Sequence, residues 1–194
     1  MAGLEDLSSL FDANIQKKLF DKRLIILSEA VHSQSAKRVI EQLLSLEAED
    51  ANKDIWMFLN SPGGEVSSGF GIYDTIRFIR PKVKIIVTGL AASIATVVLL
   101  GADKEFRYSM PNSRILIHQP LISGSIQGQA SDIEIHANEI LKTREKIAQL
   151  YHKETGQPLE RVRHDIERDY WMTTQEACEY GLITKIVNSW NEVL

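Results

Sequence analysis

Cysteine is almost absent from this chain of 194 residues, which contains only Cys178. A single cysteine excludes an intramolecular disulfide and is typical of a protein in a reducing compartment. Cys178 falls in a predicted helix without an evident basic neighbour, so we expect a packing residue and not a nucleophile.

Basic residues are not in excess either. The chain has 22 Lys and Arg against 26 Asp and Glu, a formal net charge of −4, which gives no indication of a surface for nucleic acid. Among the five histidines no pair has convincing metal-ligand spacing with a carboxylate, so the sequence predicts no metal site.

Export and membrane signals are also lacking. The first seven residues have neither the basic nor the apolar region of a signal peptide. The stretch 85–102 is free of charge and long enough to be considered as a membrane span, but Gly89 interrupts it and its first half is β-branched. A strand followed by a helix explains this stretch better, and we expect a soluble, cytoplasmic protein.

A phosphate-binding loop is missing as well. Asn60-Ser61-Pro62-Gly63-Gly64 lies between a predicted strand and a predicted helix, but no Gly-Lys-Ser/Thr follows, so it is not a P-loop. Paired glycines at such a turn can direct backbone N–H groups toward a ligand. The alternative is an ordinary turn from strand to helix.

What is present is an alternation of strands and helices. β-branched or apolar runs predict strands at 23–27, 54–59 and 83–88, and helical spacing predicts helices at 35–49, 66–79 and 95–100. This order indicates βαβ units on a parallel sheet. The pattern shows neither repeats nor linkers, and we expect one α/β domain over residues 1–194, with 1–13 as a variable segment.

The second half of the chain continues with shorter elements. Strands are predicted at 106–109, 114–118 and 182–187, and shorter helices at 159–168 and 174–180. Between them a long helix is expected to begin with a capping box at 131–134 and to end at Gly156. Its predicted apolar stripe consists of Ile133, Ile140, Ile147 and Tyr151.

Ser93 is the leading candidate for chemistry. It follows the strand 83–88 after a run of small residues and opens an apolar helix, where unpaired N–H groups favour developing negative charge. The alternative role is that of a simple N-cap. His118 follows an apolar strand, at the rim where α/β proteins place their sites. Among many carboxylates Asp169 stands out weakly, and residue chemistry alone permits a Ser93–His118–Asp169 triad without selecting it.

Five segments together resemble the proteolytic subunit of the Clp protease, the ClpP family. They occur in the order of the family and cover 60–64, 89–93, 111–120, 128–137 and 167–169, and the resemblance extends over about residues 15–187. It implies the ClpP/crotonase-like fold of repeated ββα-type units, with a protruding handle at 122–156 made of a strand and a long helix.

The resemblance also implies an activity and an assembly. The family's members are serine endopeptidases whose heptameric rings stack into a tetradecameric barrel, fed with unfolded proteins by an AAA+ unfoldase of the ClpX, ClpA or ClpC type. That unfoldase consumes the ATP, so the resemblance implies no cofactor for this chain. Ser93 matches the nucleophile, His118 the general base and Asp169 the third member, and the backbone N–H groups of Gly64 and Ile94 match the oxyanion hole.

Two further sets of residues follow from the resemblance. The segment expected to pair with the backbone of the substrate consists of Ile122, Ser123, Gly124, Ser125, Ile126 and Gln127. The surface pocket expected to receive loops of the unfoldase consists of Trp56, Phe58, Ile86, Thr88, Tyr108, Met110 and Val187.

The chain departs from the family's usual pattern at several points. Ala95 replaces a glycine after the nucleophile, Thr88 replaces an apolar pocket residue, and 1–13 lacks a basic axial loop. These departures resemble those of a second paralogue in mixed rings. The first alternative is therefore a structural or regulatory subunit that is active only with a second ClpP, and the second is a crotonase-type enzyme acting on acyl-CoA.

Overall fold

The computed structural model describes residues 13–121 and 128–193. After a helical segment at 13–21, the strands are β1 (Leu24–Leu27), β2 (Ile55–Ser61), β3 (Val83–Ala92), β4 (Arg107–Ser109), β5 (Arg114–Ile117), β6 (Tyr170–Thr173) and β7 (Lys185–Ile186). The helices are α2 (Ser33–Glu49), α3 (Val66–Phe78), α4 (Ile94–Leu100), α5 (Ala130–Thr155), α6 (Leu159–Asp165) and α7 (Thr174–Tyr180), with 3₁₀ turns η1 (Lys104–Phe106) and η2 (Trp190–Glu192).

The strands form one mixed sheet. Its main path is β1-β2-β3-β4-β7, with every pair parallel, as the alternation of strands and helices predicts. β5 pairs with β3 in parallel, and β6 pairs with β5 in antiparallel fashion. The sequence pattern missed β6, and the last strand is two residues long where 182–187 had been expected.

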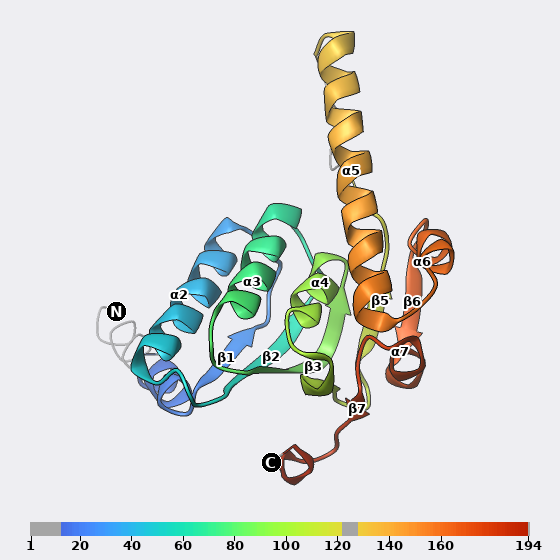
Figure 1. Ribbon diagram of the computed structural model, residues 1–194. Helices are drawn as coiled ribbons and strands as arrows, with labels where there is room; N and C mark the ends of the chain where they lie inside the picture. The colour runs from blue at the N-terminus through green and yellow to red at the C-terminus, as the bar shows by residue number, and fades with distance from the viewer. Residues whose placement is uncertain (1–12, 122–127, 194) are drawn as a thin grey trace, which may run out of the picture.

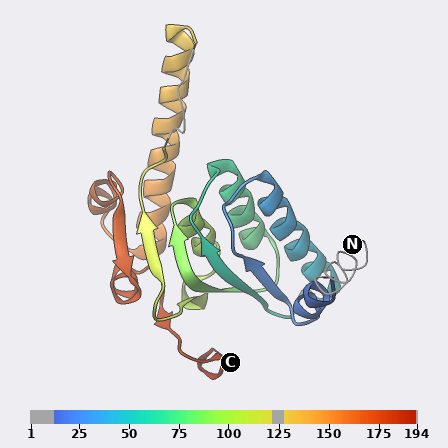
Figure 2. The same cartoon turned by 180° about the vertical axis from the view of Figure 1, so that it is seen from behind.

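The core lies between the sheet and the helices α2, α3 and α4, which cover one face (Figures 1 and 2). Because side chains alternate along a strand, β2 directs Met57 and Leu59 into this core and Trp56 and Phe58 to the opposite face. α4 is buried over its whole length, which agrees with its uniformly apolar sequence.

Helix α5 projects away from the body (Figure 1), as expected for the helical part of a handle. Only its C-terminal half packs on the core, through Ile147, Ala148, Tyr151 and Thr155. The predicted apolar stripe is therefore wrong at its start, where Ile133 is 41% exposed. The predicted capping box at 131–134 is also wrong, because α5 begins at Ala130 without a side-chain cap. Most of the expected strand of the handle, which is predicted at 122–129, lies outside the described residues, since these exclude 122–127.

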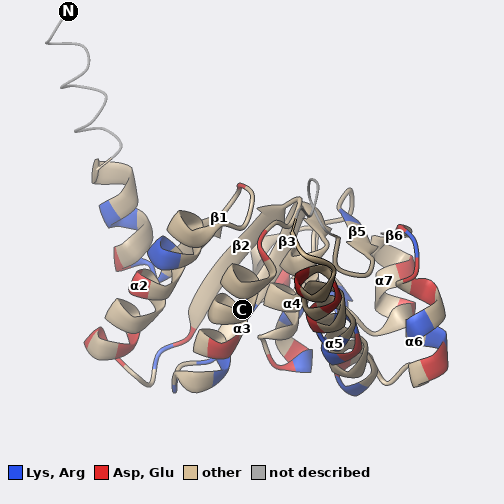
Figure 3. Cartoon of the chain, turned by 90° about the horizontal axis from the view of Figure 1, so that it is seen from above, with Lys and Arg blue, Asp and Glu red and all other residues tan. Residues whose placement is uncertain are grey.

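Other helix ends agree with the sequence. Gly156 and Gly181 end α5 and α7 in the left-handed conformation, and Thr173 and Glu176 form the predicted capping box of α7. Over the residues described, no helix combines the length and the apolar character of a membrane span. α5 has the length, but charges of both signs are spread along it (Figure 3).

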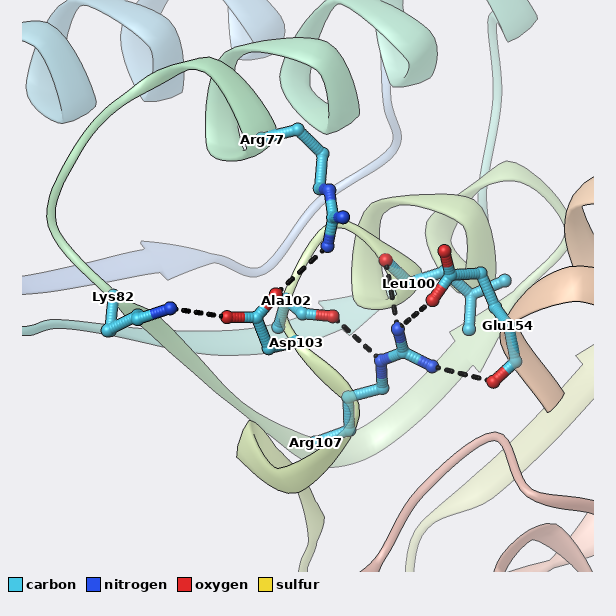
Figure 4. A network of polar contacts seen from close by, with 7 residues as sticks. All are labelled: Arg77, Lys82, Leu100, Ala102, Asp103, Arg107 and Glu154. Carbon is cyan, nitrogen blue, oxygen red and sulfur yellow. Dashed lines mark hydrogen bonds and ion pairs between the residues drawn. The ribbon is translucent and has the colours of Figure 1, made fainter.

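The buried Arg107 connects the C-terminal end of α4 to the C-terminal end of α5 (Figure 4). Arg107 is fully buried and donates hydrogen bonds to the carbonyl oxygens of Leu100 and Ala102, at the end of α4, over 3.2 and 2.9 Å. Its guanidinium also bonds the backbone carbonyl and the carboxylate of Glu154, near the end of α5. Arg107 thus fixes the base of the projecting helix to the body.

A second charge cluster lies nearby but is exposed. The Asp103 carboxylate accepts bonds from Lys82 at 2.8 Å and Arg77 at 3.0 Å, and the Lys82 ammonium lowers the pKa of that carboxyl below its ordinary value. Solvent screens such pairs, so we expect them to contribute little to stability.

We predict that Arg107→Met lowers the free energy of unfolding by about 3–5 kcal/mol, because it leaves the largely buried Glu154 carboxylate without its partner. Lys82→Met is the matched control from the exposed cluster and should shift the urea midpoint far less. Equal shifts of the urea midpoint for both variants would contradict the conclusion that the buried Arg107–Glu154 pair stabilises the fold.

Candidate active site

Ser93 occupies a strained turn between β3 and α4. Its φ of 57° and ψ of −128° are sparsely populated for a residue with a side chain and cost of order 1–3 kcal/mol. Although Ser93 holds the N-cap position of α4, its hydroxyl makes no capping hydrogen bond. The simple capping role is therefore not what the structure shows, and the hydroxyl is directed to another partner.

Strand register brings His118 and Asp169 to Ser93. β3 pairs with β5 through Ala92 and Leu116, so Ser93 and His118 both follow the ends of adjacent parallel strands. β5 pairs with β6 through Ile117 and Tyr170, so His118 and Asp169 continue the same antiparallel register by one position. The three side chains meet although they are far apart in the sequence.

The contacts have the geometry of a hydrogen-bonded relay. Ser93 Oγ lies 2.8 Å from His118 Nε2, and His118 Nδ1 lies 2.9 Å from Asp169 Oδ1. The His118 side chain is 14% exposed, whereas that of Asp169 is 65% exposed. An imidazole between a hydroxyl and a carboxylate can accept the hydroxyl proton while the carboxylate fixes the tautomer.

The glycine pair lies against the same turn. Gly63 and Gly64 have φ of 91° and 149°, and a Cβ on Gly63 would lie 2.7 Å from the Cβ of Ser93. Val31 holds the turn, since its N–H donates to the Gly63 carbonyl and its own carbonyl accepts from Glu65 N–H, both at 2.8 Å. Among the described residues, the backbone N–H groups of Gly64 and Ile94 have no acceptor; Ile94 directly follows Ser93, and Gly64 follows the glycine that lies against Ser93.

The expected docking residues gather on the sheet face opposite the helices. Phe58, Ile86 and Tyr108 are register partners in a row across β2, β3 and β4, which sequence spacing alone could not establish. Phe58, Ile86, Met110 and Val187 line a cavity of about 290 Å³. Trp56 and Tyr108 pack in the same cluster, and Thr88 belongs to neither the cavity lining nor the cluster.

Trp190 is a pocket residue that sequence reasoning missed. It comes from η2, and its ring centroid lies 4.9 Å from that of Trp56 and 6.1 Å from that of Phe58. Val193 lines the same cavity. Both follow the last predicted strand, and an isolated Trp after a strand carries no spacing signal that would place it over the sheet.

The remaining site predictions concern the segment 122–127, Cys178 and the absence of a metal site. The expected substrate-pairing segment, 122–127, lies outside the described residues. Burial raises the pKa of the Cys178 thiol, which agrees with a packing role. Within residues 13–121 and 128–193, no cluster of three or more His, Cys, Asp or Glu could hold a metal ion.

Comparison with known protein families shows a match that covers most of the chain. The model of the family described as Clp protease matches residues 9–190. The matched range includes Ser93, His118, Asp169 and the glycine pair, and it extends through Trp190.

We predict that Gly63→Ala abolishes labelling of the chain by a fluorescent fluorophosphonate, because the added Cβ would lie 2.6 Å from the carbonyl oxygen of Ala92 in a backbone of positive φ. Gly71→Ala is the matched control: it lies within α3, and its Cβ would meet only Ile40 Cδ1 at 3.6 Å. Labelling of Gly63→Ala at the unmodified rate would show that this turn does not shape the site.

Proposed function

The chain belongs to the Clp protease family, and from this membership we propose that it is a serine endopeptidase subunit that cleaves unfolded polypeptides. The observation that carries the proposal is the hydrogen-bonded triad of Ser93, His118 and Asp169. Ser93 Oγ lies 2.8 Å from His118 Nε2, and His118 Nδ1 lies 2.9 Å from Asp169 Oδ1. Family membership supports peptidase chemistry, and the geometry supports these three residues as its agents.

In the proposed mechanism, Ser93 Oγ attacks the scissile carbonyl while His118 Nε2 takes its proton. Asp169 holds the imidazole through Nδ1 and stabilises the imidazolium that forms. The N–H groups of Gly64 and Ile94 receive the developing oxyanion, a contribution worth about 10²–10³ in rate for each donor. His118 then gives the proton to the leaving amine. In the second half of the reaction, His118 takes a proton from the water molecule that attacks the acyl-enzyme and returns it to Ser93 Oγ.

We propose no metal or cofactor for this chemistry, since Ser93 supplies a nucleophile, His118 a base, and the N–H groups of Gly64 and Ile94 the oxyanion donors. ATP enters only through the partner that we propose, an AAA+ unfoldase of the ClpX, ClpA or ClpC type. The cavity of about 290 Å³ lined by Phe58 and Ile86 supports apolar docking of its loops.

Self-assembly into stacked rings is part of the same proposal. Ile135 and Leu141 are 60% and 57% exposed on the projecting half of α5, where no other described element covers them. Exposed apolar side chains on a projecting helix favour association with another copy. We propose a cytoplasmic, barrel-shaped oligomer, with a mixed ring as the alternative arrangement.

We predict that Ser93→Ala abolishes both fluorophosphonate labelling and peptide hydrolysis, a loss of roughly 10⁴ or more, while the oligomer persists in native mass measurements. Ser67→Ala, an exposed serine at the start of α3, is the control and should keep both. Residual hydrolysis near the unmodified rate in Ser93→Ala would exclude Ser93 as the nucleophile.

The same labelling separates the two leading candidates. Reaction of Ser93 in the purified chain alone supports a self-sufficient peptidase. Reaction that appears only after a second Clp protease subunit is added supports the mixed-ring subunit. The family membership already favours either of these over an acyl-CoA enzyme.

For docking, we predict that Phe58→Ser lowers unfoldase-driven protein degradation about tenfold or more and changes the cleavage of short peptides little. The reason is that Phe58 lines the cavity of about 290 Å³ on the sheet face and not the site at Ser93. Phe78→Ser is the control, since Phe78 is 82% exposed at the end of α3. Equal losses of both activities in Phe58→Ser would point to misfolding or to a different docking surface and would contradict this role of Phe58.

A further inference from the structure

A very small cavity lies directly beside the proposed nucleophile. Its lining consists of Ser93 and His118 together with the apolar residues Val66, Ile94, Val97, Pro120, Ile147 and Tyr151. Its volume is about 10 Å³, at the lower bound of the roughly 10–15 Å³ that one water molecule needs. The apolar walls suit an aliphatic group, but the volume suits only a very small one.

Tyr151 is the largest side chain in this wall, and it is fixed in place. It is 1% exposed, and its hydroxyl bonds Thr96 Oγ1. Thr96 donates its own proton to the carbonyl oxygen of Ser93 over 2.6 Å, so Tyr151 must be the donor to Thr96. Burial raises the pKa of Tyr151 above its ordinary value, which keeps the phenol protonated for this bond.

Ile147 forms the neighbouring part of the wall and is 4% exposed. It lies one turn before Tyr151 on α5, so both side chains point to the same face of the helix. The bonds between Arg107 and Glu154 hold this end of α5 against the body. The wall is therefore part of a packed helix, and widening it would require breaking buried contacts.

We propose that Tyr151 and Ile147 make the site selective for peptides with a small side chain, such as Ala, on the residue whose carbonyl Ser93 attacks. This inference rests on the proposed peptidase function. A Leu or Phe side chain at that position would have to displace the Tyr151 ring and break its bond to Thr96. Each methylene that does not fit costs about 1–3 kcal/mol, or about 10–200-fold in rate.

The test uses three peptidyl diphenyl phosphonates that differ only in having Ala, Leu or Phe at the reacting residue. Their rates of adduct formation on Ser93 of the full-length chain are measured by intact mass. We expect the Ala compound to react at least about tenfold faster than the Leu and Phe compounds. A Leu or Phe compound that reacts as fast as the Ala compound would overturn the inference, as would the failure of all three on a chain that fluorophosphonate labels.

Variants of the wall provide the matched comparison. Tyr151→Leu should reduce the preference for Ala over Phe about tenfold or more, and Ile147→Ala provides a second route to a wider cavity. Tyr151→Phe keeps the ring and removes only the hydroxyl, so the preference should stay within about threefold of the unmodified chain. An unchanged preference in both Tyr151→Leu and Ile147→Ala would overturn the inference.

Fluorophosphonate has no such side chain and serves as the reference. If it fails to label Ser93 under any condition, the proposed peptidase function itself is wrong. If it labels Ser93 while the order of the three phosphonates is reversed, only the selectivity inference fails.

Discussion

The pairing register at the end of β5 is the constraint on which the site depends. Parallel pairing with β3 sets His118 beside Ser93, and antiparallel pairing with β6 sets Asp169 beside His118. A shift of one residue in either pairing would turn side chains to the opposite face of the sheet and separate the three groups. The β3–β5 and β5–β6 pairings therefore set the relative positions of Ser93, His118 and Asp169.

Packing maintains the strained geometry around these ladders. Ser93, Gly63 and Gly64 have backbone conformations that are unfavourable for most residues. They are held in place because Ser93 leads directly into α4, which is buried throughout. Arg107 and Tyr151 then connect the end and the start of α4 to α5. The projecting helix α5 is thus hydrogen-bonded to α4, the helix that begins directly after Ser93. The same contacts hold Tyr151 in the wall of the small cavity beside Ser93.

Much of this arrangement is predictable from the sequence. The β-branched runs of β2 and β3 and the helices between them follow hydrophobic periodicity, and the small residues before Ser93 indicate a sharp turn. What periodicity could not supply is β6, because Tyr170–Thr173 is short and lacks alternation. Residue chemistry alone therefore left Asp169 one candidate among many, and the resemblance to the family singled it out. Helical spacing correctly predicts that Tyr151 lies on a buried helix face, but only tertiary packing reveals that this face lies against Ser93.

The most direct test of the central claim is a crystal structure of the chain after reaction with a fluorophosphonate. We predict a covalent bond from Ser93 Oγ to phosphorus, with the phosphonyl oxygen about 2.7–3.1 Å from the backbone nitrogens of both Gly64 and Ile94. An adduct on another residue, or a phosphonyl oxygen directed away from these two N–H groups, would contradict the assignment of this site as a serine peptidase centre.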